Sequence, residues 1–239
     1  SYSIVAYQTA YLKTWFPVQY MAAVLTLESG AKKTEDWAPY LEDCRRTRFP
    51  DHVDEAPNMG IDIHPPDINV SQADFTVAWD DSQTRTNCNG HIRFGLGAIK
   101  GVGRVAIDGI LAERDKGGSF TSLHDLCARV SSRAVNRATL EALIESGALD
   151  SLHGNGRRAA MIASVEDAVS IGQSAAADRA AGQNTMFDMF QENQAAPEVR
   201  LHDIHPWDQA EMLTRERACL GFHVSGHPLD AFEQEVMTY

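Results

Sequence analysis

The clearest candidate functional residues are two glycines in the run Ile99-Lys100-Gly101-Val102-Gly103-Arg104. A hydrophobic residue followed by Gly-x-Gly is typical of a helix-hairpin-helix motif, because glycine lets the backbone turn tightly and approach another surface. Amides at the start of the following helix can then hold a phosphate oxygen. The run therefore predicts a DNA-phosphate contact by Lys100, Gly101, Val102, Gly103 and Arg104. An ordinary turn between two helices would have the same pattern, and this alternative stays open.

A second, degenerate copy of the hairpin follows in Leu143-Ile144-Glu145-Ser146-Gly147. Two such hairpins form a compact unit that can straddle a duplex backbone, so Ser146 and Gly147 are also candidate DNA-binding residues. The carboxylate of Glu145 repels phosphate. We therefore expect this copy to be mainly structural.

A third pattern lies in the run Gln183-Asn184-Thr185-Met186-Phe187. Apolar residues in a polar stretch without a core-forming period are typical of docking peptides. Gln-x-x-(Leu/Met)-Phe matches the peptide that bacterial proteins insert into the sliding clamp, which makes Gln183, Met186 and Phe187 the candidate clamp-binding residues. The neighbouring pair Met189-Phe190 lacks a glutamine at the matching position.

Charge and composition limit the function classes. The net charge of −12 argues against a nucleic-acid partner, but residues 91–137 hold eight basic and four acidic side chains, so one local contact with a polyanion stays possible. Four scattered cysteines without a Cys-x-x-Cys pair favour a reducing cytoplasm and disfavour a metal site. No apolar run is long enough for a membrane helix. The absence of an initiator Met suggests a piece of a longer protein.

Several elements must position these patterns, and the predicted fold class is mainly α, with short helices in a tandem helix-hairpin-helix arrangement and one small β-hairpin. Apolar spacing predicts a helix before Pro17, a second over 18–29 and a third that Asp36 caps. Prolines in 47–69 predict a loop, and 75–79 with 91–94 predict the β-hairpin. Short helices follow over 95–170, with Asn136 and Asn155 as caps, and a last helix covers about 208–222.

With these residues in view, the chain resembles the bacterial DNA polymerase III alpha subunits, the C-family replicative polymerases. The matching stretches, in family order, are YQTAYLK from Tyr7, MAAV from Met21, EDCRR from Glu42, PPDIN from Pro65, FGLGAIKGVG from Phe94, SGALD from Ser146 and LGFHVSGHPLD from Leu220. The resemblance implies that 1–70 is the C-terminal part of the fingers and 71–170 the β-hairpin with the tandem helix-hairpin-helix region. It implies that 171–209 is a flexible linker with the clamp-binding peptide, and that 210–239 leads toward an OB-fold.

The resemblance also implies a function: this part of the catalytic subunit holds duplex DNA and docks on the sliding clamp during template-directed DNA synthesis, beside other subunits of the replicative polymerase. The family's palm, whose aspartates hold two Mg²⁺ ions for nucleotidyl transfer, is not represented here, so we expect no catalytic residue, no cofactor and no polymerase activity from this chain alone. The chain departs from the family between Thr47 and His64, where it is longer; we interpret this as a surface insertion.

Two other functions compete with this interpretation. A helix-hairpin-helix DNA glycosylase also places a catalytic aspartate after its Gly-x-Gly hairpin, and Asp125 is the candidate. Such an enzyme needs an aromatic pocket for a flipped base, whereas Asp125 lies in what reads as a capped helix. An adaptor that binds only proteins would fit the charge of −12.

Overall fold

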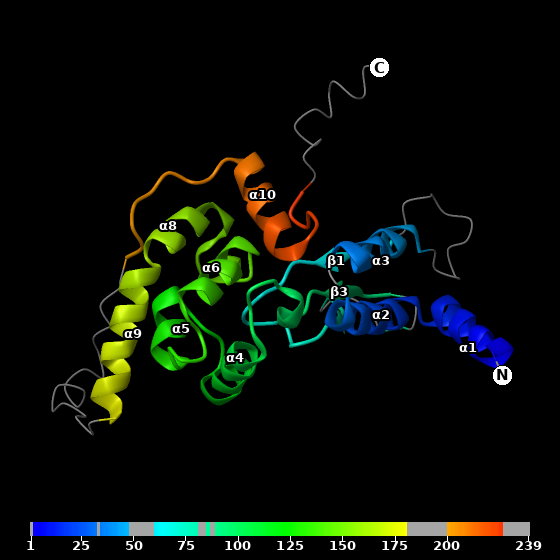
Figure 1. The fold of residues 1–239 in the computed structure, drawn as a ribbon, viewed down its shortest axis with the longest axis horizontal. Helices are drawn as coiled ribbons and strands as arrows, with labels where there is room; N and C mark the ends of the chain where they lie inside the picture. Colours follow the sequence, from blue (N-terminus) through cyan, green and yellow to red (C-terminus); the bar gives the residue numbers. More distant parts are fainter. Residues whose placement is uncertain are drawn as a thin grey trace, which may run out of the picture.

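The computed structural model describes residues 2–32, 34–47, 60–80, 85–86, 89–180 and 200–226. Its elements fall into two sides along the long axis (Figure 1). Helices α1 to α3 and a small sheet lie on one side, and helices α4 to α9 lie on the other, with α10 beside α6. The described chain is mainly helical, which confirms the predicted fold class.

The N-terminal side begins with α1 (Tyr2–Trp15), α2 (Pro17–Ala31) and α3 (Thr34–Arg46). Pro17 starts α2 as predicted, because the first helical position needs no amide hydrogen. The prediction that Asp36 caps α3 is wrong: the helix already begins at Thr34, so that Asp36 lies in its first turn, where a negative charge suits the helix dipole.

The sheet has three short strands, β1 (Ile63–His64), β2 (Thr76–Ala78) and β3 (His91–Arg93), in the order β1-β3-β2. The predicted hairpin is present as the antiparallel pair β2 and β3, with Val77 opposite Ile92. Strand β1 pairs with β3 in parallel and was missed, since its two residues lie among the prolines that predict a loop. Residues 48–59 of the expected insertion lie outside the described residues.

The second side starts with the 3-10 turn η2 (Leu96–Ala98) and continues with helices α4 to α9. Their bounds are α4 (Arg104–Gly117), α5 (Leu123–Arg129), α6 (Arg137–Glu145), α7 (Asp150–His153), η3 (Asn155–Arg157), α8 (Arg158–Ala163) and α9 (Val165–Ala180), and the last helix is α10 (Gln209–Leu220). Asn136 caps α6 as predicted, accepting a hydrogen bond from the amide of Thr139.

Two predictions for this side are wrong. Asn155 does not cap a helix; Gly154 adopts a positive φ of 84° and leaves Asn155 inside η3. Helix α9 continues to Ala180, although the sequence predicts a flexible linker from residue 171. The run is rich in alanine, which favours a helix without any apolar period, and Gly172 lets α9 approach the backbone of Cys127 on α5.

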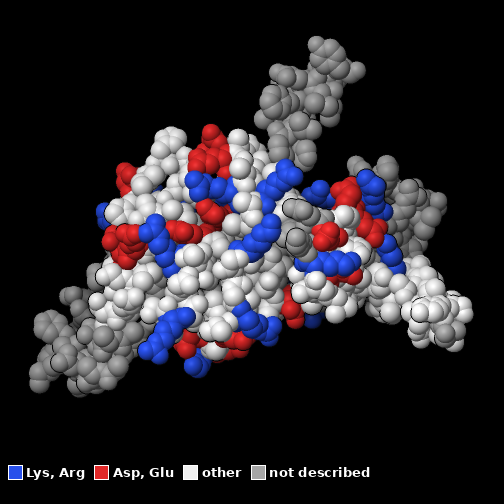
Figure 2. All heavy atoms as spheres, in the orientation of Figure 1, with Lys and Arg blue, Asp and Glu red and all other residues white. Residues whose placement is uncertain are grey.

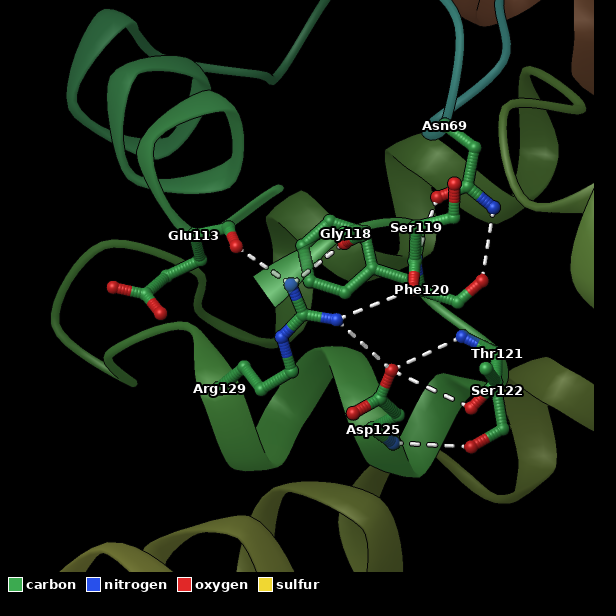
Figure 3. A network of polar contacts seen from close by, with 9 residues as sticks. All are labelled: Asn69, Glu113, Gly118, Ser119, Phe120, Thr121, Ser122, Asp125 and Arg129. Atoms are coloured by element: carbon green, nitrogen blue, oxygen red, sulfur yellow. Dashed lines mark hydrogen bonds and ion pairs between the residues drawn. The ribbon is translucent and has the colours of Figure 1, made fainter. Parts of the chain in front are cut away.

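The turn around Asn69 joins the sheet side to the helical side (Figure 3). The Asn69 amide group donates to the carbonyl of Phe120 and accepts from the amide of Phe120, at 2.9 and 2.7 Å. Arg114 of α4 donates to the carbonyls of Ile68 and Ser71 at 3.1 and 2.7 Å. These bonds satisfy buried backbone groups from both sides, so the turn holds α4 in a fixed position relative to the sheet.

Helix α1 has no buried residue, and its aromatic side chains Tyr7, Tyr11 and Trp15 form an exposed ladder at helical spacing. Its only charged residue is Lys13, and the tip of this helix shows no charged side chain on the face in view (Figure 2). No helix in the described ranges has the length and apolar character needed to cross a membrane.

Four histidines lie in half-buried or buried places without a neighbouring anion strong enough to compensate. The rings of His64 and His91 stack with centroids 3.7 Å apart across β1 and β3. Burial, together with the charge of Arg93 nearby, lowers the pKa of both. Burial also lowers the pKa of His124, whose two ring nitrogens have no hydrogen-bond partner among the described residues, and of His153.

We predict that the chain loses stability as the pH falls below about 6.5, the pKa of an unfolded histidine. A lowered folded-state pKa means that the unfolded chain binds protons first, so the stability present above pH 6.5 is lost progressively toward the lower folded-state pKa values. Urea unfolding at pH 8, 7, 6 and 5 measures this. His124→Leu should reduce the dependence, while substitution of the exposed His205 by Gln should leave it unchanged; an equal slope in both variants would contradict the prediction.

Candidate nucleic-acid interface

The first hairpin connects η2 to α4, as the Gly-x-Gly pattern predicts. Gly101 has a φ of +88°, which side-chain-bearing residues rarely adopt, and a Cβ at this position would lie 3.3 Å from the Cβ of Ala142 on α6. Val102 is buried in the core and the Lys100 amide donates to the carbonyl of Cys219 on α10 at 3.0 Å. The hairpin is therefore held against α6 and α10 by its own turn.

The N-terminus of α4 lacks a side-chain cap. Gly103 is the N-cap residue, its backbone is extended at φ −79°, and a Cβ there would meet no atom within 4 Å. The N-termini of α5, α6 and α10 are instead capped by Ser122, Asn136 and Asp208. The amide of Ala106 already donates to the carbonyl of Gly103, but the amides of the exposed residues Arg104 and Val105 have no hydrogen-bond partner among the described residues, so an outside anion can accept from them.

Two exposed cations flank this helix start. Lys100 lies in the hairpin, and no ion pair joins it to a described carboxylate. Arg104, in the first turn of α4, pairs with Asp108 one turn later at 3.1 Å. This pair is solvent-exposed and therefore weak, so the guanidinium can turn to a stronger anion.

The second hairpin faces the interior. Ser146 is buried and donates to the carbonyl of Leu143, and Gly147 has a φ of +82° in a buried turn. A Cβ on Gly147 would collide with the guanidinium of Arg158. Ser146 and Gly147 therefore have no surface available for a phosphate in this structure, unlike the residues of the first hairpin.

The guanidinium of Arg158 lies against Gly147 and occupies the space that a phosphate would need beside this hairpin. Its side chain is 2% exposed and donates to both carboxylate oxygens of Asp150, at 2.8 and 2.5 Å. It also lies 3.6 Å from Glu216 of α10, which is fully buried. Burial disfavours the charged guanidinium, but hydrogen bonds and attraction from Asp150 and Glu216 outweigh this and raise the pKa of Arg158.

Glu145, the acidic residue that makes the second hairpin a poor phosphate site, has a partner within the chain. Its carboxylate accepts from Arg215 of α10 at 2.7 Å, and Arg215 also stacks over the ring of Trp207 at 4.4 Å. The second hairpin is therefore covered by α10 through Glu145 and Arg158, which agrees with a structural role.

Asp125, the candidate base of the glycosylase alternative, is tied into the loop before α5 (Figure 3). Its Oδ2 atom accepts from the amide of Thr121 at 3.0 Å and lies 3.3 Å from the guanidinium of Arg129. Arg129 also donates to the carbonyls of Glu113 and Gly118 and lies over the ring of Phe120. The contacts of Oδ2 close the loop before α5, so they indicate a structural role for this carboxylate.

Charge on the surface is mixed. Lys and Arg side chains lie interspersed with Asp and Glu on the face in view (Figure 2). Many of them form pairs one helical turn apart, such as Arg104 with Asp108 and Arg137 with Glu141. A contact with DNA must therefore be local, because no continuous basic surface covers this face.

Three other candidate features are a metal site, reactive cysteines and the clamp-binding residues. Among the described residues, no group of three or more His, Cys, Asp or Glu could hold a metal ion. Burial raises the pKa of the Cys44, Cys127 and Cys219 thiols to about 12, which leaves them unreactive. The predicted clamp-binding residues Gln183, Met186 and Phe187 lie outside the described residues.

Sequence reasoning missed Arg158 and Glu216, the buried charges that join the second hairpin to α10. The sequence does contain a signal for Arg158: it directly precedes the apolar run Ala159-Ala160-Met161-Ile162. An arginine that precedes such a run is a candidate for a buried ion pair.

Comparisons with known proteins agree with this geometry. Residues 60–160 match the family model described as the helix-hairpin-helix motif. The chain is 39% identical over 236 residues to the DNA polymerase III subunit alpha of Neisseria meningitidis serogroup B, and 37% identical over 239 residues to those of Haemophilus influenzae and Escherichia coli K12. These alignments cover 99% or 100% of this chain but only 18% of each relative.

We predict that Arg158→Met lowers the free energy of unfolding by about 3–5 kcal/mol, because it leaves the Glu216 carboxylate buried without its cation. Adding Glu216→Gln should recover part of the loss, since an amide oxygen still accepts from the amides of Val224 and Ser225. Urea unfolding at pH 7 measures both. Arg157→Met, an exposed neighbour, is the control; an equal loss there would show that Arg158 acts through something other than its buried ion pairs.

Proposed function

We propose that this chain, which is homologous along its whole length to a segment of bacterial DNA polymerase III alpha subunits, holds duplex DNA by its phosphates through the first hairpin. The observation that carries the proposal is the start of α4. Gly103 offers no side-chain cap, and the amides of the exposed residues Arg104 and Val105 have no hydrogen-bond partner among the described residues, in a segment that matches the helix-hairpin-helix model.

The contact would work through the backbone. A phosphate oxygen accepts from the first-turn amides of α4, where the helix dipole also favours a negative charge. Gly103 lets the sugar-phosphate strand approach without a Cβ in the way, and Gly101 and Val102 fix the turn. Lys100 and Arg104 add attraction to the same phosphate or its neighbour. Such binding reads no bases, so it is independent of sequence and sensitive to salt.

In this proposal the two hairpins have different tasks. The first contacts DNA, while the second, with Ser146 and Gly147 buried, holds the first in place through α6 and α10. The proposal therefore narrows the DNA-binding residues to Lys100, Gly101, Val102, Gly103 and Arg104.

For the whole protein, we propose template-directed DNA synthesis by a DNA-directed DNA polymerase, in the bacterial cytoplasm and with the other subunits of the replicative enzyme. The chain spans about 18% of the length of its relatives. Nucleotidyl transfer needs carboxylates that hold magnesium ions, and the described residues offer no such group. In this proposal the segment binds the duplex and does not carry out nucleotidyl transfer.

We also propose that Gln183, Met186 and Phe187 bind the sliding clamp. The side-chain amide of Gln183 can both donate and accept hydrogen bonds, which fixes the register of an extended peptide. Burial of Met186 and Phe187 in an apolar groove contributes roughly 1.5–3 kcal/mol for each side chain, and ordering of the peptide offsets part of this gain. Micromolar affinity, about −8 kcal/mol, is the expected range.

A pair of glycine variants tests the DNA contact. Gly103→Ala should destabilise the fold by no more than about 1 kcal/mol, because its Cβ meets open space although alanine is a poorer N-cap than glycine. It should weaken duplex binding roughly tenfold, because the Cβ hinders the approach of the phosphate to the α4 amides and so weakens a charge-assisted hydrogen bond. Gly101→Ala should instead destabilise the fold by about 1–3 kcal/mol, because of its positive φ. Fluorescence anisotropy with a random-sequence duplex and urea unfolding give the two readouts.

The charge-reversal variant Lys100→Glu/Arg104→Glu should abolish duplex binding, and Lys116→Glu, at the far end of α4, is its control. Duplex binding that is unaffected by Gly103→Ala and by the charge reversal would remove the first hairpin as the contact. A chain that binds no duplex at any salt concentration but still binds the clamp would favour the protein-only adaptor.

For the clamp, we predict that Met186→Ala/Phe187→Ala removes binding to the cognate sliding clamp and leaves duplex binding intact. The matched control is Met189→Ala/Phe190→Ala, which deletes the same side chains without the preceding glutamine and should matter less. Surface plasmon resonance on immobilised clamp measures both. If the first variant bound as tightly as the parent chain, Met189 and Phe190 would become the candidate residues.

A further inference from the structure

A pocket of about 550 Å³ lies where the last turn of α10 and the loop after it meet the end of α3. Arg45 and Arg217 supply its charged side chains, and residues 221–224 and Gly226 of the loop supply the remaining wall. The Arg45 guanidinium donates to the carbonyl of His223 at 3.4 Å, which holds one cation at the edge of the pocket.

The positive charge at this pocket exceeds the negative charge around it. Arg217 is exposed, and no ion pair connects it to a carboxylate of the described chain. Arg45, with a side chain 58% exposed, lies 3.8 Å from Glu42, but Glu42 also pairs with Arg46 at 3.1 Å. One carboxylate is thus shared between two guanidinium groups, and a third, Arg217, has none.

The nearest other acid does not cancel this excess. Glu216 is fully buried behind the loop, where it accepts from the amides of Val224 and Ser225 and lies beside Arg158. Its charge is compensated inside the protein, on the other side of the loop from the solvent. Among the described residues, an anion in the pocket would therefore meet Arg45 and Arg217 without meeting a free carboxylate.

The pocket lies next to the first hairpin. The carbonyl of Cys219 accepts from the amide of Lys100, and Arg217 precedes Cys219 by two residues in the same turn of α10, a rise of about 3 Å. The first hairpin and the pocket therefore share the last turn of α10, and a duplex strand that runs from the α4 amides along the end of this helix would meet Arg217 with a further phosphate.

We infer that Arg45 and Arg217 form a second phosphate site, which holds a further backbone phosphate of the duplex bound at the first hairpin. This inference rests on the proposed DNA contact and extends it from α4 to α10 and α3. Guanidinium groups suit the task, because their planar donor pairs match phosphate oxygens. The contact increases affinity and fixes the orientation of the duplex, but it does not recognise bases.

The test is the salt dependence of duplex binding by the complete chain. With a random-sequence duplex, Arg45→Gln/Arg217→Gln should lower the slope of log K against log salt by about 0.9, the value for the one phosphate that this site holds. The matched control, Arg133→Gln/Arg200→Gln, removes the same charge from two exposed arginines outside this pocket and should leave the slope unchanged. Thermal unfolding checks that all four substitutions preserve the fold.

The outcomes separate the two proposals. An unchanged slope in the pocket variant, or an equal change in the control, overturns the pocket site and leaves the hairpin contact standing. A reduced slope in the pocket variant together with normal binding by Lys100→Glu/Arg104→Glu supports the pocket and overturns the hairpin. Absence of duplex binding by the unsubstituted chain overturns both.

Discussion

The arrangement of the helical side depends on the buried guanidinium of Arg158. It lies between Asp150, which follows the second hairpin, and Glu216 of α10, and all three charges are largely removed from water. Such burial is costly unless every charge has a partner. Because these residues come from α7, α8 and α10, the network only closes when the three helices are packed together.

This constraint explains why two hairpins of similar sequence differ in role. Docking of α10 buries the second hairpin beneath Arg158 and Arg215, so that its glycine serves a tight internal turn. The same docking brings Cys219 to the amide of Lys100 and supports the first hairpin from behind, while the start of α4 stays open to solvent. One buried network thus produces one closed and one open hairpin.

The run PPDIN, which begins at Pro65, also has a structural role. Asp67 accepts from the hydroxyl of Ser151 near the second hairpin, and the amide of Ile68 donates to the carbonyl of Ala148. The side chain of Asn69 bonds to the backbone of Phe120. This turn therefore connects the sheet, α4 and the second hairpin, and it explains why residues outside both hairpins matter for their relative position.

The sequence by itself determined the local features. Gly-x-Gly spacing located the first hairpin and a degenerate copy with one glycine located the second. Pro17 and Asn136 located helix starts, and alternating apolar residues located β2 and β3, because each depends on neighbours within a few residues. The strand β1, the cover of α10 over the second hairpin and the pocket at Arg45 and Arg217 were decided only by tertiary structure. They depend on contacts between residues far apart in the chain. Local patterns cannot specify which buried charge finds which partner, and at the second hairpin that pairing decides which surface remains for a ligand.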